Sequence, residues 1–346
     1  MFERLKDWMS TYGSARDGAA ATRSRPAAPA QPVKTPPASQ PARKSAAVAS
    51  LADVAAAFHG TLLRPQEKEA TLSSDLEAAI YKDVLAVIRS GVHPEDLPKL
   101  PAAVAQLLQK LRDENTTARD IVTLINQEPV LASSVLKVAN SPYYRTGEDE
   151  ISSIEQAVQR LGFDRLSTIT LSILMRPVFD VKPIYFRQFS KYLWEHSQDC
   201  AIACAELARK AGEDYFTAYL VGLVHDIGKL VIFQALMKAM KEAHPDVHPD
   251  PRLVGTIVDR TSLQLSCVSL KHWELPKVVQ LAVCDQVKAG ADPDRLGKLS
   301  YLLYTANLLS EFHLLLTENR LSDDEADEIL GQYGLSAAMV HGLFKD

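Results

Sequence analysis

Several kinds of feature are scarce in this chain of 346 residues. No uninterrupted apolar run reaches the roughly 18–20 residues that span a bilayer. The first residues, MFERLKDWM, lack the apolar core of a signal peptide. Few runs alternate apolar and polar residues, which disfavours β-strands. These absences predict a cytoplasmic, helical protein without a membrane span.

Cysteine is also scarce, and no two cysteines form a CxxC pair. The four are Cys200, Cys204, Cys267 and Cys284. Cys200 and Cys204 are four residues apart, so they share one face of a helix. We predict that the cysteines are buried free thiols, as is usual in a reducing cytoplasm.

Basic charge does not dominate, because the net charge is −5, while 47% of the residues are hydrophobic. The hydrophobic content is sufficient for one large or two modest domains. The acidic balance makes a nucleic-acid-binding protein the weakest of three functional hypotheses. That hypothesis would depend on scattered basic residues in the first fifty positions.

Residues 1–50 are rich in alanine, proline and serine beyond a short amphipathic start. A segment of this composition buries too little apolar surface to offset its ordering entropy, so we predict a flexible tail. Residues 51–95 are predicted to form a helical lead-in, because apolar residues there begin to recur every three or four positions.

The rest of the chain has the same spacing, which predicts an all-α fold of many medium-length helices. Glycines and prolines interrupt the runs, among them Pro129, Gly162 and Pro177. We place one helical subdomain at 96–183 and a second at 184–346. The segment 176–186, RPVFDVKPIYF, is a candidate hinge between them.

Four motifs occur together and in order between Leu97 and Gly162: LPKLP, INQEPVL, ANSPYY and SIEQAVQRLG. With LWEHS, LVHDIGK and HWELP further along, they resemble the HDOD domain, the "HD-related output domain" of bacterial signalling proteins. The resemblance covers about residues 90–310. It implies a multi-helix HDOD fold, in which an N-terminal helical subdomain precedes an HD-like one, and a role in signal transduction.

The ANSPYY stretch is the best candidate for a recognition surface, through Asn140, Tyr143 and Tyr144. Each residue also has a plain structural interpretation. Asn140 and Ser141 follow an apolar helix and precede Pro142, so they can end that helix and bond its last carbonyl groups.

HD-type phosphohydrolases use one His, a His-Asp doublet and a distant Asp as metal ligands. The resemblance assigns these roles to His196, to His225 with Asp226, and to Asn307, and it places Lys229 as possible support. Asparagine offers a neutral oxygen, which weakens the attraction for a cation. One divalent metal ion, with Asn307 or Asp285 helping, is therefore one hypothesis. The other is an inherited polar cluster whose members bond to one another.

The further histidines of two-metal cyclic-di-GMP hydrolases are missing, and Ser262 stands near one expected place. We therefore predict a non-catalytic regulatory protein that binds other signalling proteins, with a nucleotide as a conceivable ligand. The alternative is a metal-dependent phosphohydrolase acting on a nucleotide or phosphoester. Activity gained on changing Asn307 to Asp would indicate how close the chain lies to that alternative.

Overall fold

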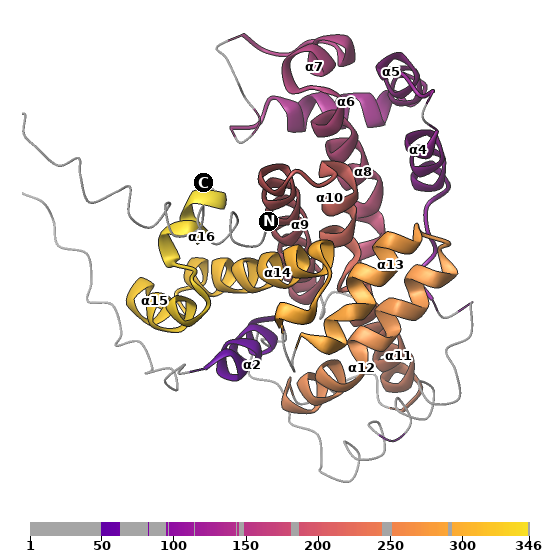
Figure 1. The fold of residues 1–346 in the computed structure, drawn as a ribbon. Helices are drawn as coiled ribbons and strands as arrows, with labels where there is room; N and C mark the ends of the chain where they lie inside the picture. The colour runs from indigo at the N-terminus through magenta and orange to yellow at the C-terminus, as the bar shows by residue number, and fades with distance from the viewer. Residues whose placement is uncertain are drawn as a thin grey trace, which may run out of the picture.

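The computed structural model describes residues 50–62, 82, 95, 97–113, 115–142, 144, 149–180, 187–243, 251–289 and 293–344. Helices make up the fold, and no strand occurs in these ranges, which confirms the all-α prediction (Figure 1). Most of the predicted tail, most of the lead-in after Leu62 and Tyr143 lie outside the described residues.

In chain order the helices make two groups, one before and one after residues 181–186. The first comprises α2 (Leu51–Leu62), α4 (Ala102–Arg112), α5 (Ala118–Asn126), α6 (Pro129–Ala139), α7 (Ile154–Leu161) and α8 (Phe163–Phe179). The second comprises α9 (Arg187–Ala211), α10 (Tyr215–Val224), α11 (Ile227–Ala243), α12 (Pro251–His272), α13 (Lys277–Cys284), α14 (Lys298–Thr317), α15 (Asp323–Leu330) and α16 (Ala337–Leu343). Short 3₁₀ helices η3 (Asp285–Lys288), η4 (Pro293–Arg295) and η5 (Gly331–Tyr333) join the later ones. Helix α2 is in the first group by sequence but packs against α9, α12 and α14 of the second.

Local sequence explains where several of these helices begin and end. Pro129 is the first residue of α6, where its missing N–H costs no hydrogen bond. The Ser153 side chain accepts a hydrogen bond from the Gln156 amide and caps α7. Gly162, at a φ of 84°, ends α7 and precedes α8. The left-handed φ favours glycine, so this residue can turn the chain between two helices without strain.

The HWELP motif ties the first group to the second. Trp273 begins the α12–α13 turn, is buried, and donates its indole N–H to the Pro98 carbonyl over 2.6 Å. The Arg112 guanidinium donates to the Glu274 carbonyl in the same turn at 3.1 Å. The indole therefore packs the break between α12 and α13, and its partner is the LPKLP segment 175 residues away.

Two sequence-based predictions are wrong in part. Cys200 and Cys204 are buried free thiols, but Cys267 and Cys284 form a disulfide, since the packing of α12 against α13 brings their Cα atoms to 5.7 Å. Pro177 does not end a helix, because α8 continues to Phe179. A proline in the last turn removes only one backbone hydrogen bond near a helix end, where the cost is small.

One stretch, Tyr215–Met237, is long and apolar enough to cross a membrane by composition alone. It spans α10 and most of α11, and 78% of its most apolar window is buried inside the protein. Neighbouring helices bury this stretch, so its apolar character is that of a core segment.

Candidate metal centre

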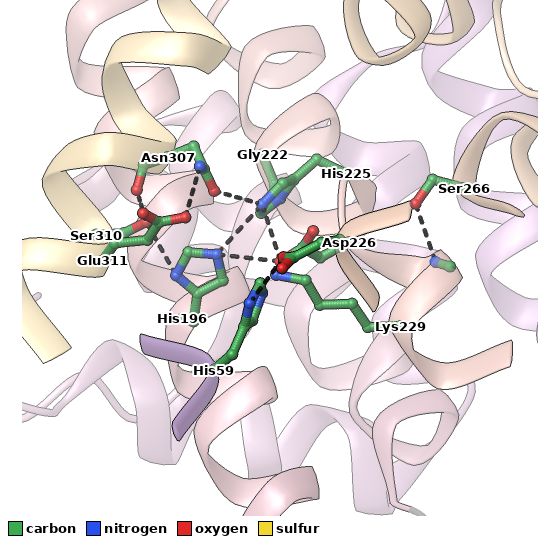
Figure 2. A network of polar contacts seen from close by, with 12 residues as sticks. His59, His196, Gly222, His225, Asp226, Lys229, Ser266, Asn307, Ser310 and Glu311 are labelled. Carbon is green, nitrogen blue, oxygen red and sulfur yellow. Dashed lines mark hydrogen bonds and ion pairs between the residues drawn. The ribbon is translucent and has the colours of Figure 1, made fainter. Parts of the chain in front are cut away.

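Four helices of the second group bring the predicted metal ligands together (Figure 2). His196 lies in the middle of α9, and His225 follows the last residue of α10. Asp226 occupies the turn before α11, and Asn307 lies on α14. The structure therefore joins residues that are up to 111 positions apart (307 − 196) in one cluster, with Lys229 beside it.

Two glycines in LVGLVHDIGK allow this approach. A Cβ on Gly222 would lie 2.6 Å from the Ala201 Cα and from the Cys200 carbonyl oxygen, so α10 contacts α9 backbone to backbone. A Cβ on Gly228 would lie 2.0 Å from the Ser262 carbonyl oxygen on α12. Only glycine fits at either place. The close contacts set His225 against His196 and fix the start of α11 against α12.

Three ligand atoms form a nearly equilateral triangle. The Nε2 atoms of His196 and His225 are 3.3 Å apart, and the Asp226 Oδ2 lies 3.2 Å from the first and 3.3 Å from the second. A tetrahedral ion with bonds of about 2.0–2.1 Å separates its ligands by about 3.3–3.4 Å. The triangle therefore has the dimensions of one face of such a site, and the residues fit a single divalent ion.

The outer contacts of both imidazoles fix their tautomers. The Nδ1 of His225 lies 2.6 Å from the Gly222 carbonyl oxygen, which can only accept, so this nitrogen carries a proton. Ser310 donates its hydroxyl hydrogen to the backbone carbonyl of Asn307. The Ser310 oxygen can therefore accept a hydrogen bond from the Nδ1 of His196, at 3.1 Å. Protonated Nδ1 atoms direct both Nε2 atoms toward the triangle, as in histidines that bind metals.

Charge within the cluster follows from its neighbours. Burial lowers the pKa of His196 to about 4, because the hydrogen bond and charge of Asp226 do not offset the lost hydration. Burial also disfavours the charged form of His225, yet the Asp226 carboxylate outweighs it and raises the pKa of His225 well above its usual value. His196 is therefore neutral, which is the form in which a histidine binds a metal. His225 is protonated, so a metal that binds it must displace the proton on its Nε2.

Asp226 is ionised, and it already has a cationic partner. Burial alone would raise the pKa of this carboxyl group, but the charges of His225 and Lys229 lower it well below its usual value. The Lys229 ammonium lies 2.5 Å from Oδ2, the same oxygen that faces the two imidazoles. An arriving ion must share that oxygen with Lys229.

Asn307 completes the cluster from α14. Its Oδ1 lies 2.9 Å from the Nε2 of His225. Its Nδ2 donates to the Oε1 of Glu311, one turn further along, at 2.9 Å. The motif comparison did not single out Glu311, and the only sequence signal is its spacing of four residues from Asn307 on one helix.

Helix α2 covers the cluster. The Phe58 side chain is fully buried, its ring centroid is 4.6 Å from that of His196, and the Lys229 ammonium lies 4.8 Å from the same phenyl centroid. The neighbouring His59 pairs with Asp259 on α12 at 3.0 Å. No sequence pattern assigned a role to either residue, because a lone His or Phe in a short amphipathic helix carries no information about its neighbours in the fold.

The other candidate residues lie elsewhere. Asp285 begins η3 and pairs with Lys288 at 2.8 Å, and among the described residues the ligand atoms that come together belong to His196, His225 and Asp226 and not to Asp285. Asn140 bridges two segments: Nδ2 donates to the carbonyls of Leu136 and Ile151, and Oδ1 accepts from the Ile151 amide. Tyr144 is partly buried against the core. Their role in recognition stays a prediction.

Residues 97–288, more than half of the chain, match the HDOD domain family. A candidate metal-dependent phosphohydrolase from Shewanella amazonensis SB2B has a similar structure, with a TM-score of 0.55 and 23% identity, over 78% of this chain and 98% of that one. An HDOD domain protein of unknown function from Geobacter sulfurreducens aligns with a TM-score of 0.50 and 20% identity, over 77% and 93%.

Two curated proteins are similar over shorter stretches. An uncharacterized protein of Treponema pallidum is 24% identical over 54% of this chain and 36% of its own length. The 3'3'-cGAMP-specific phosphodiesterase 1 of Vibrio cholerae is 40% identical over 21% of this chain and 15% of its own length. The chain thus matches only about a third, or less, of either relative.

Proposed function

The chain belongs to the HDOD domain family, and we propose that it is a cytoplasmic signal-transduction module that acts by binding other signalling proteins and does not turn over a substrate. The main support for this proposal is that helix α2 covers the HD-type cluster. Helix α2 precedes the matched family region, and its Phe58 ring rests on His196 and Lys229. A change in the position of α2 therefore alters the cluster directly.

The closed state of the cluster also disfavours catalysis. The side chain of His196 is 0% exposed, that of His225 8% and that of Asp226 13%. Catalytic metal sites keep a coordination position open to water or substrate. Neutral Asn307 leaves the cluster one carboxylate short, and the Lys229 ammonium already neutralises Asp226.

A metal-dependent phosphohydrolase is the second candidate, because the ligand triangle has the dimensions of a tetrahedral site. His196, His225, Asp226 and Asn307 would hold the ion, which when bound would lower the pKa of a water molecule next to a phosphoester. Ser310 and the Gly222 carbonyl would keep both Nε2 atoms directed inward. A nucleotide is the substrate or ligand to test first, since one relative is named for a cyclic-dinucleotide phosphodiesterase.

Elemental analysis of the purified chain separates the two candidates, together with the variants His225→Ala and Asp226→Ala. Under the regulatory proposal, the protein hydrolyses no phosphoester in a screen with added Mn²⁺. Stoichiometric Mn, Fe or Zn that both variants lose, accompanied by phosphoester turnover, would instead establish the hydrolase.

The role of α2 is tested by hydrogen exchange and by histidine modification with diethyl pyrocarbonate. We expect Phe58→Ala to increase amide exchange in α2 and the modification of His196 and His225, while α9 amides keep their protection. Phe344→Ala is the matched control, because that ring is also buried but stacks on His313, away from the cluster. If α2 exchanges only together with α9, it is a fixed part of the core and cannot transmit a signal to the cluster.

A further inference from the structure

A bonded pair of cysteines lies between α12 and α13, away from the HD-type cluster. Cys267 and Cys284 are both partly exposed, whereas the free thiols of Cys200 and Cys204 are buried. The Cα atoms of the pair are 5.7 Å apart, which is the usual separation for a disulfide. The bond can therefore form and break while the two helices stay where they are, and reagents in solvent reach this pair before the other two thiols.

The place of this disulfide distinguishes it from a permanent cross-link. Structural disulfides are rare in a reducing cytoplasm, and those that occur there are mostly transient, catalytic or redox-sensing. Small secreted domains depend on cross-links because their cores are small, but this chain has an extensive core that runs through both groups of helices. Reversibility of the bond rests on the cytoplasmic location proposed above.

We infer that Cys267 and Cys284 form a reversible thiol–disulfide site that exchanges electrons with low-molecular-weight thiols and disulfides of the glutathione class. In oxidation, one cysteine thiolate attacks a sulfur of glutathione disulfide and releases one glutathione thiolate. The second cysteine thiolate attacks the mixed disulfide and releases the other. Two electrons pass from the protein to glutathione disulfide, and the two thiol protons pass to the solvent. Two reduced glutathione molecules reverse the reaction.

Reduction frees α13 rather than α12, because α12 is held from its other side. Ser266, next to Cys267, accepts the Gly228 amide hydrogen at 2.9 Å (Figure 2). A Cβ on Gly228 would lie only 2.0 Å from the Ser262 carbonyl oxygen, so α12 packs directly on the start of α11. Helix α13 has only eight residues and is marginal alone. The disulfide is thus a covalent tie of a short helix to a fixed one.

The tied segment, 267–284, contains the anchor between the two groups of helices. Trp273 donates its indole N–H to the Pro98 carbonyl, and the Glu274 carbonyl accepts from Arg112. Both contacts lie in the turn between α12 and α13, inside the loop that the disulfide closes. The redox state of the pair therefore sets how firmly this turn holds the LPKLP segment and α4.

Glutathione buffers that range from fully reduced to fully oxidised test the exchange. The full chain is equilibrated in each buffer, accessible thiols are blocked with N-ethylmaleimide, and the intact mass gives the number of labels. We expect both cysteines of the pair to be labelled in the most reducing buffer and neither in the most oxidising one. A pair that stays bonded throughout would overturn the inference and count against the cytoplasmic location. A pair that is labelled throughout would overturn the inference alone, and phosphoester turnover would overturn only the regulatory proposal.

Amide hydrogen exchange of the same samples measures the effect on α13. Reduction is expected to speed exchange of the α13 amides about 100-fold, because the link restricts a segment with a sequence separation of 17. Helix α11 is expected to keep its protection. Cys284→Ser should exchange as the reduced parent does in every buffer. Cys204→Ala is the matched control, since it removes a buried thiol outside the pair and should respond as the parent does. Equal α13 exchange in the oxidised and reduced parent, or a redox response that survives in Cys284→Ser, would refute the inference.

Discussion

Replacement of Gly222 by alanine tests the packing that builds the cluster. The added Cβ would lie 2.6 Å from the Ala201 Cα and the Cys200 carbonyl oxygen and 2.7 Å from the Ala201 nitrogen. Carbon atoms in contact are normally about 3.5–4.0 Å apart, so α10 must move away from α9 by roughly 1 Å. All three obstructing atoms belong to the backbone and cannot rotate aside.

The magnitude follows from two opposing effects. Overpacking costs about 1–3 kcal/mol, and rigid backbone neighbours favour the upper end of that range. Alanine gains about 1 kcal/mol over glycine inside a helix. We expect Gly222→Ala to lower the free energy of unfolding by about 2 kcal/mol net, and the Tm by about 4–8 °C. The displacement also moves His225 away from His196.

Urea unfolding followed by far-UV circular dichroism measures the change. Gly255→Ala on α12 is the matched control, because the nearest atom to its added Cβ, in His59, is 4.0 Å away. That variant is expected to be as stable as the parent or more stable, by up to about 1 kcal/mol. Gly222→Ala with the stability of Gly255→Ala would refute the close contact of α9 and α10.

Three further outcomes are expected. Trp273→Phe removes the indole donor to the buried Pro98 carbonyl and should lower the free energy of unfolding by about 1–3 kcal/mol, measured by urea unfolding; an unchanged midpoint would contradict this. Dithiothreitol should destabilise the oxidised chain by about 3 kcal/mol, since the Cys267–Cys284 link closes a loop with a sequence separation of 17; a Cys267→Ser variant should show no effect of the reductant. Asn140→Asp keeps the acceptor for the Ile151 amide but turns a carboxylate oxygen toward the carbonyls of Leu136 and Ile151. The Tm of this variant should therefore fall. A Tm equal to that of the parent would exclude the hydrogen bonds by which Asn140 joins the two segments.

The link between the cluster and α2 gives the regulatory proposal a physical route. A helix of 12 residues is marginal alone in water, so α2 depends on the surface that it covers. It packs against α9, α12 and α14, and its buried side chains are those of Val54, Phe58, Thr61 and Leu62. An event that competes for that surface would uncover His196 and Lys229 without unfolding the core.

Much of the local structure could be predicted from the sequence. The spacing of apolar residues predicted an all-α fold of many helices, and Gly162 predicted the end of α7. The order of motifs predicted the family and brought His196, His225, Asp226 and Asn307 into one hypothesis. These features depend on periodicity, capping and turn chemistry, which act over a few residues and are therefore legible in the chain.

Other features depended on distances that only the tertiary structure decides. The sequence could not show that Cys267 meets Cys284, that Phe58 covers His196, or that Glu311 accepts a hydrogen bond from Asn307. Each contact requires two helices to pack with a particular rotation about their axes and a particular shift along them. A single residue type is compatible with many such placements. The sequence by itself determined the helices and the candidate ligands, whereas packing decided which charges face them and what covers them, because buried neighbours are set by the whole core.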